Sequence, residues 1–318
     1  MEYHHTQWFN TYSIVALDRD SHMLGAAVQT HQMSVGSVVP WLLPGIGALV
    51  TQSLTNISFG PLGMSMLREG VPAPRVVEAL AASDPKANLR QFAVVDVKGR
   101  VGAWTGDHCI PHAGHHIGAG YSVQANMMAR DTVVQAMAQA YEGAQGNFAE
   151  RILAALRAAQ AEGGDIRGMQ SAALKIVDGK PEAIQTTPTW RSIYDLRVDE
   201  HNDPLTELAR LVRLRSAERL DRDGLDALED GQREQALDLW AQARAKAPEL
   251  EELSFWQAME LADRPADIEA ALEILKPMLS QDPRREHWID LIRRIQKVGI
   301  LERKGAAGEI IAALESGS

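Results

Sequence analysis

The segment Thr11–Asn56 reads TYSIVALDRDSHMLGAAVQTHQMSVGSVVPWLLPGIGALVTQSLTN, and it decides the fold. Apolar residues alternate on both sides of a turn at Arg19–His22, which predicts two antiparallel strands over Thr11–Asp18 and Met23–Thr30. A further strand is expected over Ile46–Ser53. The two paired strands each have one apolar face, so both are expected to pack against a core.

Polar and hydroxyl residues gather where these strands end. If the strands pair in the order of the sequence, their ends meet at one edge of a sheet. We therefore expect a binding or reaction site at that edge. The residues that would line it are Thr11, Ser13, Thr30, His31, and Ser53 to Asn56.

The chain after Asn56 alternates pairs of helices with groups of strands. This order predicts an α+β fold with antiparallel sheets, because a parallel sheet needs a regular alternation of strand and helix. The expected helices occupy Phe59–Glu69, Ala73–Ala82, Asp131–Glu142 and Phe148–Ala161. The expected strands occupy Gln91–Val97, Val101–Thr105, Gln170–Val177 and Arg191–Val198.

The composition narrows the class of protein and its partners. Of 318 residues, 45% are hydrophobic and 23% are charged, which is typical of a globular protein. The net charge of −10 argues against nucleic acid or an anionic membrane as the main partner. Cys109 is the one cysteine, so no internal disulfide can form, and we expect a reducing, cytoplasmic location. The first ten residues lack the features of a signal peptide.

Charged residues become denser after residue 200. Residues 1–200 hold 33 Asp, Glu, Lys or Arg side chains, whereas the following 118 residues hold 41. This shift, together with Asn202-Asp203-Pro204, predicts a boundary between a sheet-rich body and a helical appendage. We expect an N-terminal extension over 1–10, the body over 11–202 and a helical domain over 203–318.

The helical part contains an internal repeat. A small residue, a large one, a small or flexible one and a proline occur at spacings typical of the second helix of a tetratricopeptide repeat. Two such repeats are fewer than independent stability usually needs, so an unrelated helical bundle stays an alternative. The positions are Ala236, Trp240, Ala243 and Pro248, and 35 residues later Ala271, Leu275, Met278 and Pro283.

Several dispersed motifs resemble one bacterial family. They are TYSIVA, VGSVVPW and TQS, then TGDHC, AGH and VQANM, and finally GGDIRGMQSAAL and DLRVDEHNDP. In this order they resemble the family catalogued as domain of unknown function 1028 (DUF1028), over about residues 11–215. The resemblance implies a fold similar to that of the N-terminal nucleophile (Ntn) hydrolases. That fold is a four-layer αββα sandwich, in which two antiparallel sheets lie between helix layers.

The resemblance also implies a mechanism. In Ntn hydrolases the first residue of the mature chain attacks an amide carbonyl, and its own α-amine acts as the base. Thr11 stands at the matching position, which would require removal of the ten residues before it. Ser53–Asn56, at the end of a strand and before a helix, could offer backbone N–H groups as an oxyanion hole, and Asp165 and Ser171 resemble the supporting residues of the threonine members. Threonine members of the superfamily also place a lysine early in the third strand, whereas residues 35–38 contain none.

The segment 106–128 allows a different chemistry. Cys109 and His115 are a candidate nucleophile and base, because a nearby imidazole can lower the pKa of a thiol. Cysteine, histidine and aspartate also bind zinc, but no second group of ligands occurs, and we expect neither a metal nor a cofactor. Gln124 and Asn126 stand at a strand end, where their amides could bind an amide or a carboxylate ligand.

Charged residues near the end of the body are expected to form ion pairs, with Arg167 as the exception that could clamp a carboxylate. The favoured function is hydrolysis of a small amide- or peptide-like C–N bond by Thr11. The alternatives are a binding module without catalysis and an amidohydrolase that uses Cys109 and His115 without processing. As partners we expect a small amide- or carboxylate-bearing molecule, a second copy in a homodimer and a protein at the helical repeats, but no nucleic acid and no membrane.

Overall fold

The structure, a computed structural model, describes residues 8–9, 11–264 and 267–316. The chain divides into two compact units, Met1–Val212 and Arg213–Ser318, and each is described by itself. The division falls inside helix α6 (Pro204–Glu229), whereas the composition predicted a boundary after Asn202. Across the described residues, no helix has both the length and the apolar content that a membrane span needs.

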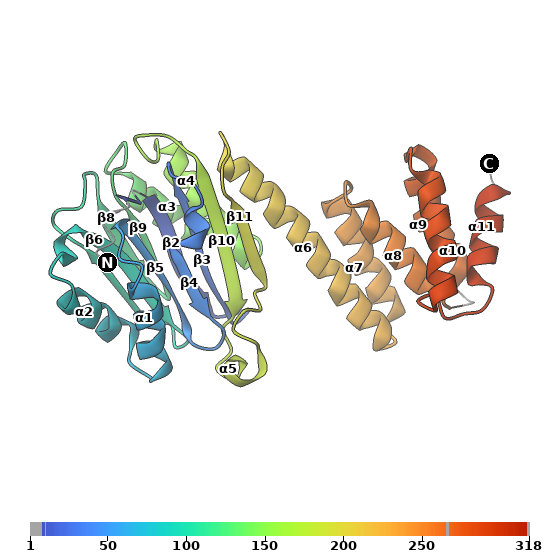
Figure 1. The fold of residues 1–318 in the computed structure, drawn as a ribbon, viewed down its shortest axis with the longest axis horizontal. Coiled ribbons are helices and arrows are strands. Elements are labelled where there is room, and N and C mark those ends of the chain that lie inside the picture. The colour runs from blue at the N-terminus through green and yellow to red at the C-terminus, as the bar shows by residue number, and fades with distance from the viewer. Residues whose placement is uncertain (1–7, 10, 265–266, 317–318) are drawn as a thin grey trace, which may run out of the picture. The chain divides into compact units, whose positions relative to one another are not determined.

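The first sheet of the N-terminal unit has five antiparallel strands in the order β1-β5-β6-β7, and β4 also pairs with β5. The strands are β1 (Trp8–Phe9), β4 (Pro40–Leu43), β5 (Gly47–Leu54), β6 (Arg90–Asp96) and β7 (Val101–Thr105). Helices α1 (Phe59–Arg68) and α2 (Ala73–Ser83) cover one face of this sheet (Figure 1). There Leu49 and Phe92 of the sheet pack against Phe59 and Leu80 of the helices.

The second sheet has six antiparallel strands in the order β11-β10-β3-β2-β9-β8. The strands are β2 (Thr11–Asp18), β3 (Met23–Thr30), β8 (Gly114–Gly118), β9 (Tyr121–Ala125), β10 (Ser171–Asp178) and β11 (Tyr194–Val198). Helices α3 (Val133–Gly143) and α4 (Phe148–Ala161) cover its outer face. Ile14 and Val123 of the sheet share a core with Met137 and Ile152 of these helices.

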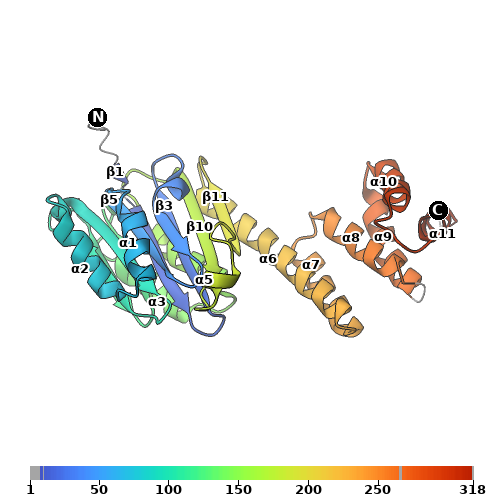
Figure 2. The ribbon, with the colours of Figure 1, turned by 60° about the horizontal axis from the view of Figure 1, so that its bottom comes forward.

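The two sheets pack against each other through their remaining faces. Side chains alternate along a strand, so Ile14 faces the helices whereas Val15 faces the other sheet. The core between the sheets contains Val15 and Val28 from the second sheet and Val50 and Ala93 from the first. Figure 2 shows α1 and α2 on the side of the first sheet that is turned away from the second.

The strand ends rich in hydroxyl residues do not meet at a single sheet edge. Thr11 pairs with Thr30 inside the second sheet, whereas Ser53 belongs to the first sheet, where it pairs with Phe9 and Arg90. The expected shared edge is therefore wrong. These residues lie at the ends of strands from two sheets that pack face to face, so a site there is enclosed by both sheets.

Short elements complete the N-terminal unit, and the C-terminal unit consists of helices in its described residues. The short elements are η1 (Val35–Ser37), η2 (Ala87–Leu89) and α5 (Ala183–Thr186). The helices after α6 are α7 (Arg233–Lys246), α8 (Glu251–Ala262), α9 (Ile268–Gln281), α10 (Arg285–Val298) and α11 (Ala306–Glu315). Their core includes the fully buried Ala236, Ala271 and Leu275.

Close packing around Trp240 gives a prediction for the C-terminal unit. A Cβ added at Gly224 would lie 2.5 Å from Trp240 Cδ1, and Trp240 is 1% exposed, with its Nε1 donating to the Asp221 carbonyl oxygen at 3.0 Å. Gly224→Ala should therefore overpack the core at a cost of about 1–3 kcal/mol, which outweighs a helix-propensity gain of under about 1 kcal/mol.

Gly308 is the matched control for Gly224, because a Cβ added there meets no atom within 4 Å. Gly308→Ala should raise the free energy of unfolding by about 0.5–1 kcal/mol through helix propensity alone. Urea unfolding of the full chain, followed by hydrogen exchange on peptides from residues 213–318, measures both variants. Equal shifts of the same sign would contradict the assigned packing.

Candidate functional site

A row of hydroxyl residues crosses three neighbouring strands of the second sheet. Thr30 of β3 pairs with Thr11 of β2 on one side and with Ser171 of β10 on the other. All three residues are fully buried, and so is Ser13, two residues further along β2. The alternation that turns Tyr12 toward the helices turns Thr11 and Ser13 toward the other sheet.

Two glutamines of the first sheet reach across to the second sheet, and one of them, Gln52, contacts this row. Gln52 Nε2 donates to the Thr11 carbonyl oxygen at 3.1 Å and to Gln91 Oε1 at 2.7 Å. Ser13 Oγ donates to Gln52 Oε1 at 2.6 Å, and Asn126 Nδ2 donates to Gln91 Oε1 at 2.8 Å. Both sheets are thus joined by one buried hydrogen-bond network with Gln91 at its centre.

The neighbours of Gln91 set the orientation of its amide. Gln91 Nε2 donates to the carbonyl oxygens of Ala125 at 2.9 Å and Gly114 at 3.1 Å. Carbonyl oxygens only accept, so the nitrogen must face them and Oε1 must point the other way. The same nitrogen lies 2.9 Å from Thr105 Oγ1, which in turn lies 2.8 Å from His115 Nδ1. The network therefore extends from the buried centre to the exposed His115.

Two buried oxygens at the end of this network have no hydrogen-bond partner, namely Thr11 Oγ1 and Asn126 Oδ1. The two residues are neighbours, because the Asn126 backbone N–H donates to the Thr11 carbonyl oxygen at 3.1 Å. A buried polar atom without a partner costs about 1–3 kcal/mol. Two such atoms on neighbouring residues are groups that a bound water or ligand would pair with.

Gln124 does not offer its amide to a ligand. Its Nε2 donates to Ser13 Oγ at 2.6 Å, and its Oε1 accepts from Ser122 Oγ at 2.9 Å. Both ends of the side chain are thus used inside the network. Gln124 holds the strands in place, and Asn126 is the residue with an oxygen to spare.

Met127, two residues after the end of β9, connects two loops to the buried centre through its backbone. Its backbone N–H donates to the Ile110 carbonyl oxygen at 2.8 Å, and its own carbonyl oxygen accepts from the Ile166 N–H at 3.2 Å. The loop that carries Cys109 and the loop that carries Asp165 therefore both meet the strand next to Thr11. Met127 has a φ of 58°, an uncommon conformation for a residue with a side chain.

Asp165 and Arg167 form an ion pair instead of leaving the arginine for a ligand. Arg167 Nε and Nη2 lie 3.0 and 2.6 Å from the two Asp165 carboxylate oxygens. Asp165 is 2% exposed and also accepts from the His31 backbone N–H at 3.2 Å. Ser171 Oγ accepts from the Val35 N–H at 3.1 Å. Asp165 and Ser171 thus fix the turn after β3, which follows Thr30.

In the segment from Ser53 to Asn56, the first residue belongs to the sheet and the last one starts the next helix. Ser53 has a φ of 65°, which costs about 1–3 kcal/mol for a non-glycine residue, and its backbone pairs with Phe9 of β1. Asn56 donates from Nδ2 to Asp84 Oδ2 at 2.9 Å and accepts the Ser58 N–H at 3.1 Å. The Asn56 side chain therefore helps to start α1 and is occupied away from Thr11.

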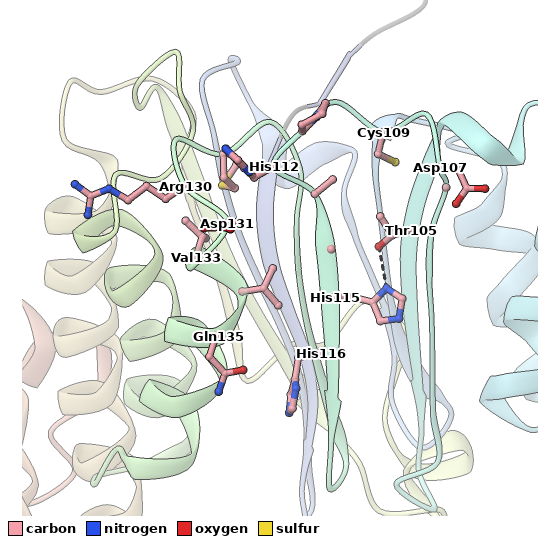
Figure 3. A pocket seen from close by; sticks show the side chains of 16 residues that line it. Thr105, Asp107, Cys109, His112, His115, His116, Arg130, Asp131, Val133 and Gln135 are labelled. Atoms are coloured by element: carbon pink, nitrogen blue, oxygen red, sulfur yellow. Dashed lines mark hydrogen bonds between the residues drawn. The ribbon is translucent and has the colours of Figure 1, made fainter.

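The segment with Cys109 and His115 lines an open cavity of about 800 Å³ between β7, β8 and the start of α3 (Figure 3). The side chain of His115 points to Thr105, and that of His116 points to the other side of β8. Cys109 Sγ donates to the Arg90 carbonyl oxygen at 3.3 Å. The Cys109 thiol is thus hydrogen-bonded to the Arg90 carbonyl and the His115 imidazole to Thr105, and not to each other.

The pKa values of this pair do not favour a reactive thiolate. Burial raises the pKa of the Cys109 thiol, and Asp107 adds to the rise, although Ser53 and Gly106 act in the opposite direction. His115 is exposed as a residue, but the protein groups packed around its ring desolvate it, and this desolvation, followed by the neighbouring His116, lowers the pKa of the His115 imidazole. A protonated thiol and a neutral imidazole are the opposite of the ion pair that activates a cysteine nucleophile. Among the described residues, no three His, Cys, Asp or Glu side chains form a group that could hold a metal ion.

The raised pKa of Cys109 gives a test with no background, because the chain has one cysteine. Iodoacetamide should alkylate the thiol at least about tenfold more slowly than a free thiol at pH 7, and the rate should rise as the pH increases, since only the thiolate reacts. Intact-mass spectrometry at several pH values measures the rate. Alkylation at pH 7 as fast as that of a small thiol would restore the hypothesis of a cysteine nucleophile.

Gln52 and Gln91 are residues that the sequence reasoning missed. Both are fully buried, and both stand on the inner faces of strands whose other inner positions are apolar. A glutamine at an inner position of an apolar strand, as in Val50-Thr51-Gln52, was the available signal, because an uncharged polar residue is seldom fully buried without a structural or chemical reason.

Comparisons with known proteins agree on one family. The model described as "Family of unknown function (DUF1028)" matches residues 11–208. The crystal structure of protein SPO2555 from Silicibacter pomeroyi, which is also assigned to DUF1028, is similar to this chain with 27% identity and a TM-score of 0.57. That similarity covers 64% of this chain and 84% of the other. No curated protein matches the chain. With a family model that matches from the start of β2 into α6, the chain belongs to the DUF1028 family.

Proposed function

We propose that the N-terminal unit is an Ntn-type amidohydrolase for a small amide, with Thr11 as its nucleophile once the preceding residues have been removed. The proposal includes the four-layer αββα sandwich of that superfamily, and two antiparallel sheets with α1–α2 and α3–α4 on their outer faces support it. One observation carries the proposal. Thr11 is the first residue of β2, a central strand of the second sheet. Its hydroxyl lies fully buried between the sheets and has no hydrogen-bond partner.

The chemistry follows from a free α-amine at Thr11. The Thr11 Oγ attacks the carbonyl carbon of the amide, and its proton passes to the α-amine. The amine then protonates the leaving nitrogen, the C–N bond breaks, and water hydrolyses the acyl ester to regenerate the hydroxyl. An α-amine suits this task because its pKa is about 8. In the uncut chain the Thr11 nitrogen belongs to an amide, so it cannot accept the proton.

The pairing of the short strand β1 suggests that cleavage before Thr11 would also expose the oxyanion hole. Trp8 and Phe9 pair with Leu54 and Ser53, whose backbone would form the oxyanion hole. Thr11 itself is fully buried in the uncut chain. Removal of the residues before Thr11 would release the backbone groups of Ser53 and Leu54 and create the basic amine at the same time.

A binding module is the second candidate, and the peptide bond between Asn10 and Thr11 favours it, because the Thr11 nitrogen of the uncut chain is an amide and not a basic amine. In this function the C-terminal unit would recruit a protein segment through helices similar to tetratricopeptide repeats. Small residues at two repeat positions, Ala236 and Ala271, are fully buried, as close helix packing in such repeats requires. This candidate needs no cut before Thr11, so the form of the N-terminus separates the two.

Reaction with a β-lactone tests the proposed function. In the test protein a Met stands directly before Thr11, so methionine aminopeptidase removes it in the cell and leaves a free α-amine on Thr11, and the full-length chain is the uncut form. We expect the cut protein to gain the mass of one lactone, because ring opening adds the whole molecule to the nucleophile, while the uncut protein stays unmodified. Equal labelling of both forms, or of neither, contradicts the proposal.

A further inference from the structure

The side-chain oxygen of Asn126 receives no hydrogen bond from the protein, and the orientations of the neighbouring side-chain amides are fixed by their own hydrogen bonds. We propose that Asn126 Oδ1 determines the specificity of the site by accepting a hydrogen bond from an N–H of the ligand, so that the site takes amides with at least one N–H and rejects carboxylates. The inference rests on the proposed function for the location of the reaction at Thr11. It goes further by naming the class of ligand and the atom that selects it.

The first step is the orientation of the Asn126 amide. Gln91 Nε2 faces the carbonyl oxygens of Gly114 and Ala125, which turns Gln91 Oε1 toward Asn126. An oxygen there needs a donor, so the Asn126 atom 2.8 Å away is Nδ2. The other end of the amide is therefore Oδ1, an atom that can only accept. A flipped amide would set two oxygens against each other and is excluded.

The second step concerns the hydrogen bonding of that oxygen. Asn126 is fully buried, and its Oδ1 has no partner among the protein groups around it. Leaving a buried acceptor unpaired is costly, and a group that brings an N–H or O–H removes the cost. The neighbouring residue Thr11 also has an unpaired oxygen, Oγ1, and Asn126 Nδ2 lies 3.5 Å from the Thr11 carbonyl oxygen, so a ligand held at Thr11 is close to the Asn126 amide.

The third step excludes a carboxylate. An ionised carboxylate has acceptor oxygens only, so it would repel Asn126 Oδ1 instead of pairing with it. The cation once expected to clamp a carboxylate, Arg167, is paired in a bidentate manner with Asp165. Gln124 uses both ends of its amide inside the network. The groups next to Thr11 thus match a neutral amide better than an acid.

Two isomeric amides test the inference on binding alone. N-ethylacetamide and N,N-dimethylacetamide have the same atoms, but only the first has an N–H. The protein is the cut form described above, which starts at Thr11 with a free α-amine. Ligand-observed nuclear magnetic resonance titrations should show about tenfold tighter binding of N-ethylacetamide, because the second isomer leaves the buried oxygen unpaired. Butyrate, a carboxylate of similar size, should not bind.

Variants of Asn126 assign the preference to one atom. Asn126→Ala should reduce the preference to less than twofold. The buried carboxyl of Asn126→Asp, protonated so that it donates to Gln91 Oε1, keeps an acceptor oxygen and should retain the preference. The control is Asn202→Ala, which removes an exposed asparagine and should leave the tenfold preference unchanged. Melting temperatures of all variants verify folding, and Asn126→Asp still tests the inference if Asn126→Ala does not fold.

Equal binding of the two isomers, a preference that survives Asn126→Ala, or no binding of either amide would overturn the inference, the last because water alone would then satisfy the oxygen. The binding preference for N-ethylacetamide and the acylation of Thr11 by a lactone are independent results. A tenfold preference without acylation would support the role of Asn126 and refute catalysis by Thr11. Acylation of the cut protein without any preference would do the reverse.

Discussion

Replacement of Thr11 by alanine in the cut protein should reduce amide hydrolysis by about 10⁴-fold or more. The substitution removes the oxygen that attacks the carbonyl, and losses of this size are typical when a nucleophile is deleted. The α-amine, the network around Gln91 and the backbone of Ser53 all remain in the variant. The measurement is the release of a chromogenic amine from a small N–H-bearing anilide.

Two variants make the Thr11 result specific. Thr11→Ser keeps a hydroxyl on the same carbon and should retain hydrolysis within about tenfold to a hundredfold of the parent. Cys109→Ser should leave the rate unchanged, because the Cys109 thiol is protonated and bonded to the Arg90 carbonyl oxygen. Activity that persists in Thr11→Ala but disappears in Cys109→Ser would contradict the proposed nucleophile.

Gln91→Leu should lower the free energy of unfolding of the N-terminal unit by about 3–5 kcal/mol. The substitution leaves the donors of Gln52 and Asn126 without their acceptor, and it removes the donor that the Gly114 and Ala125 carbonyl oxygens share. Each buried group left unpaired costs about 1–3 kcal/mol, and losses within one network do not add fully.

Gln139→Leu is the matched control for Gln91→Leu, because Gln139 is exposed on α3. This variant should change the free energy of unfolding by no more than about 0.5 kcal/mol. Urea unfolding of the full chain with hydrogen exchange on peptides from residues 11–212 assigns the loss to the correct unit. A loss below about 1 kcal/mol in Gln91→Leu would show that the network contributes little.

The elements that the sequence predicted best are those with a strong local pattern. The strands Thr11–Asp18 and Met23–Thr30 and the helix Phe148–Ala161 have the expected bounds. The alternation of inward- and outward-facing residues defines the strands, and a capping box between Asn147 and Glu150 defines the start of the helix. In these segments the local preference and the final fold agree.

The missed elements depend on partners far away in the sequence. β1 consists of Trp8–Phe9 and exists through its pairing with β5. β8 reads GHHIG, which lacks a strand-like pattern, and it is a strand because it pairs with β9. β4 likewise owes its extended form to β5. A pattern within five or fewer residues cannot specify such pairings.

The part of the candidate site that lies on single strands was predictable from the sequence. Alternation places Thr11 and Ser13 on one face of β2, and it places Gln124 and Asn126 on one face of β9. The contact of these residues with Gln52 and Gln91 joins two sheets and cannot be read from any single strand. The pairing of Arg167 with Asp165, two residues before it, was within reach of the sequence.

Tandem mass spectrometry of the lactone-treated, cut protein tests the central claim most directly, because it locates the acyl group on a residue. The proposed mechanism predicts that the peptide beginning with Thr11 carries one acyl group, on the hydroxyl oxygen, and that Thr11→Ala carries none. Digestion at acidic pH keeps the ester from shifting to the adjacent amine. An acyl group on Cys109 or on a surface lysine in place of Thr11, or on the N-terminal residue of Thr11→Ala, would contradict the claim that the Thr11 hydroxyl is the nucleophile.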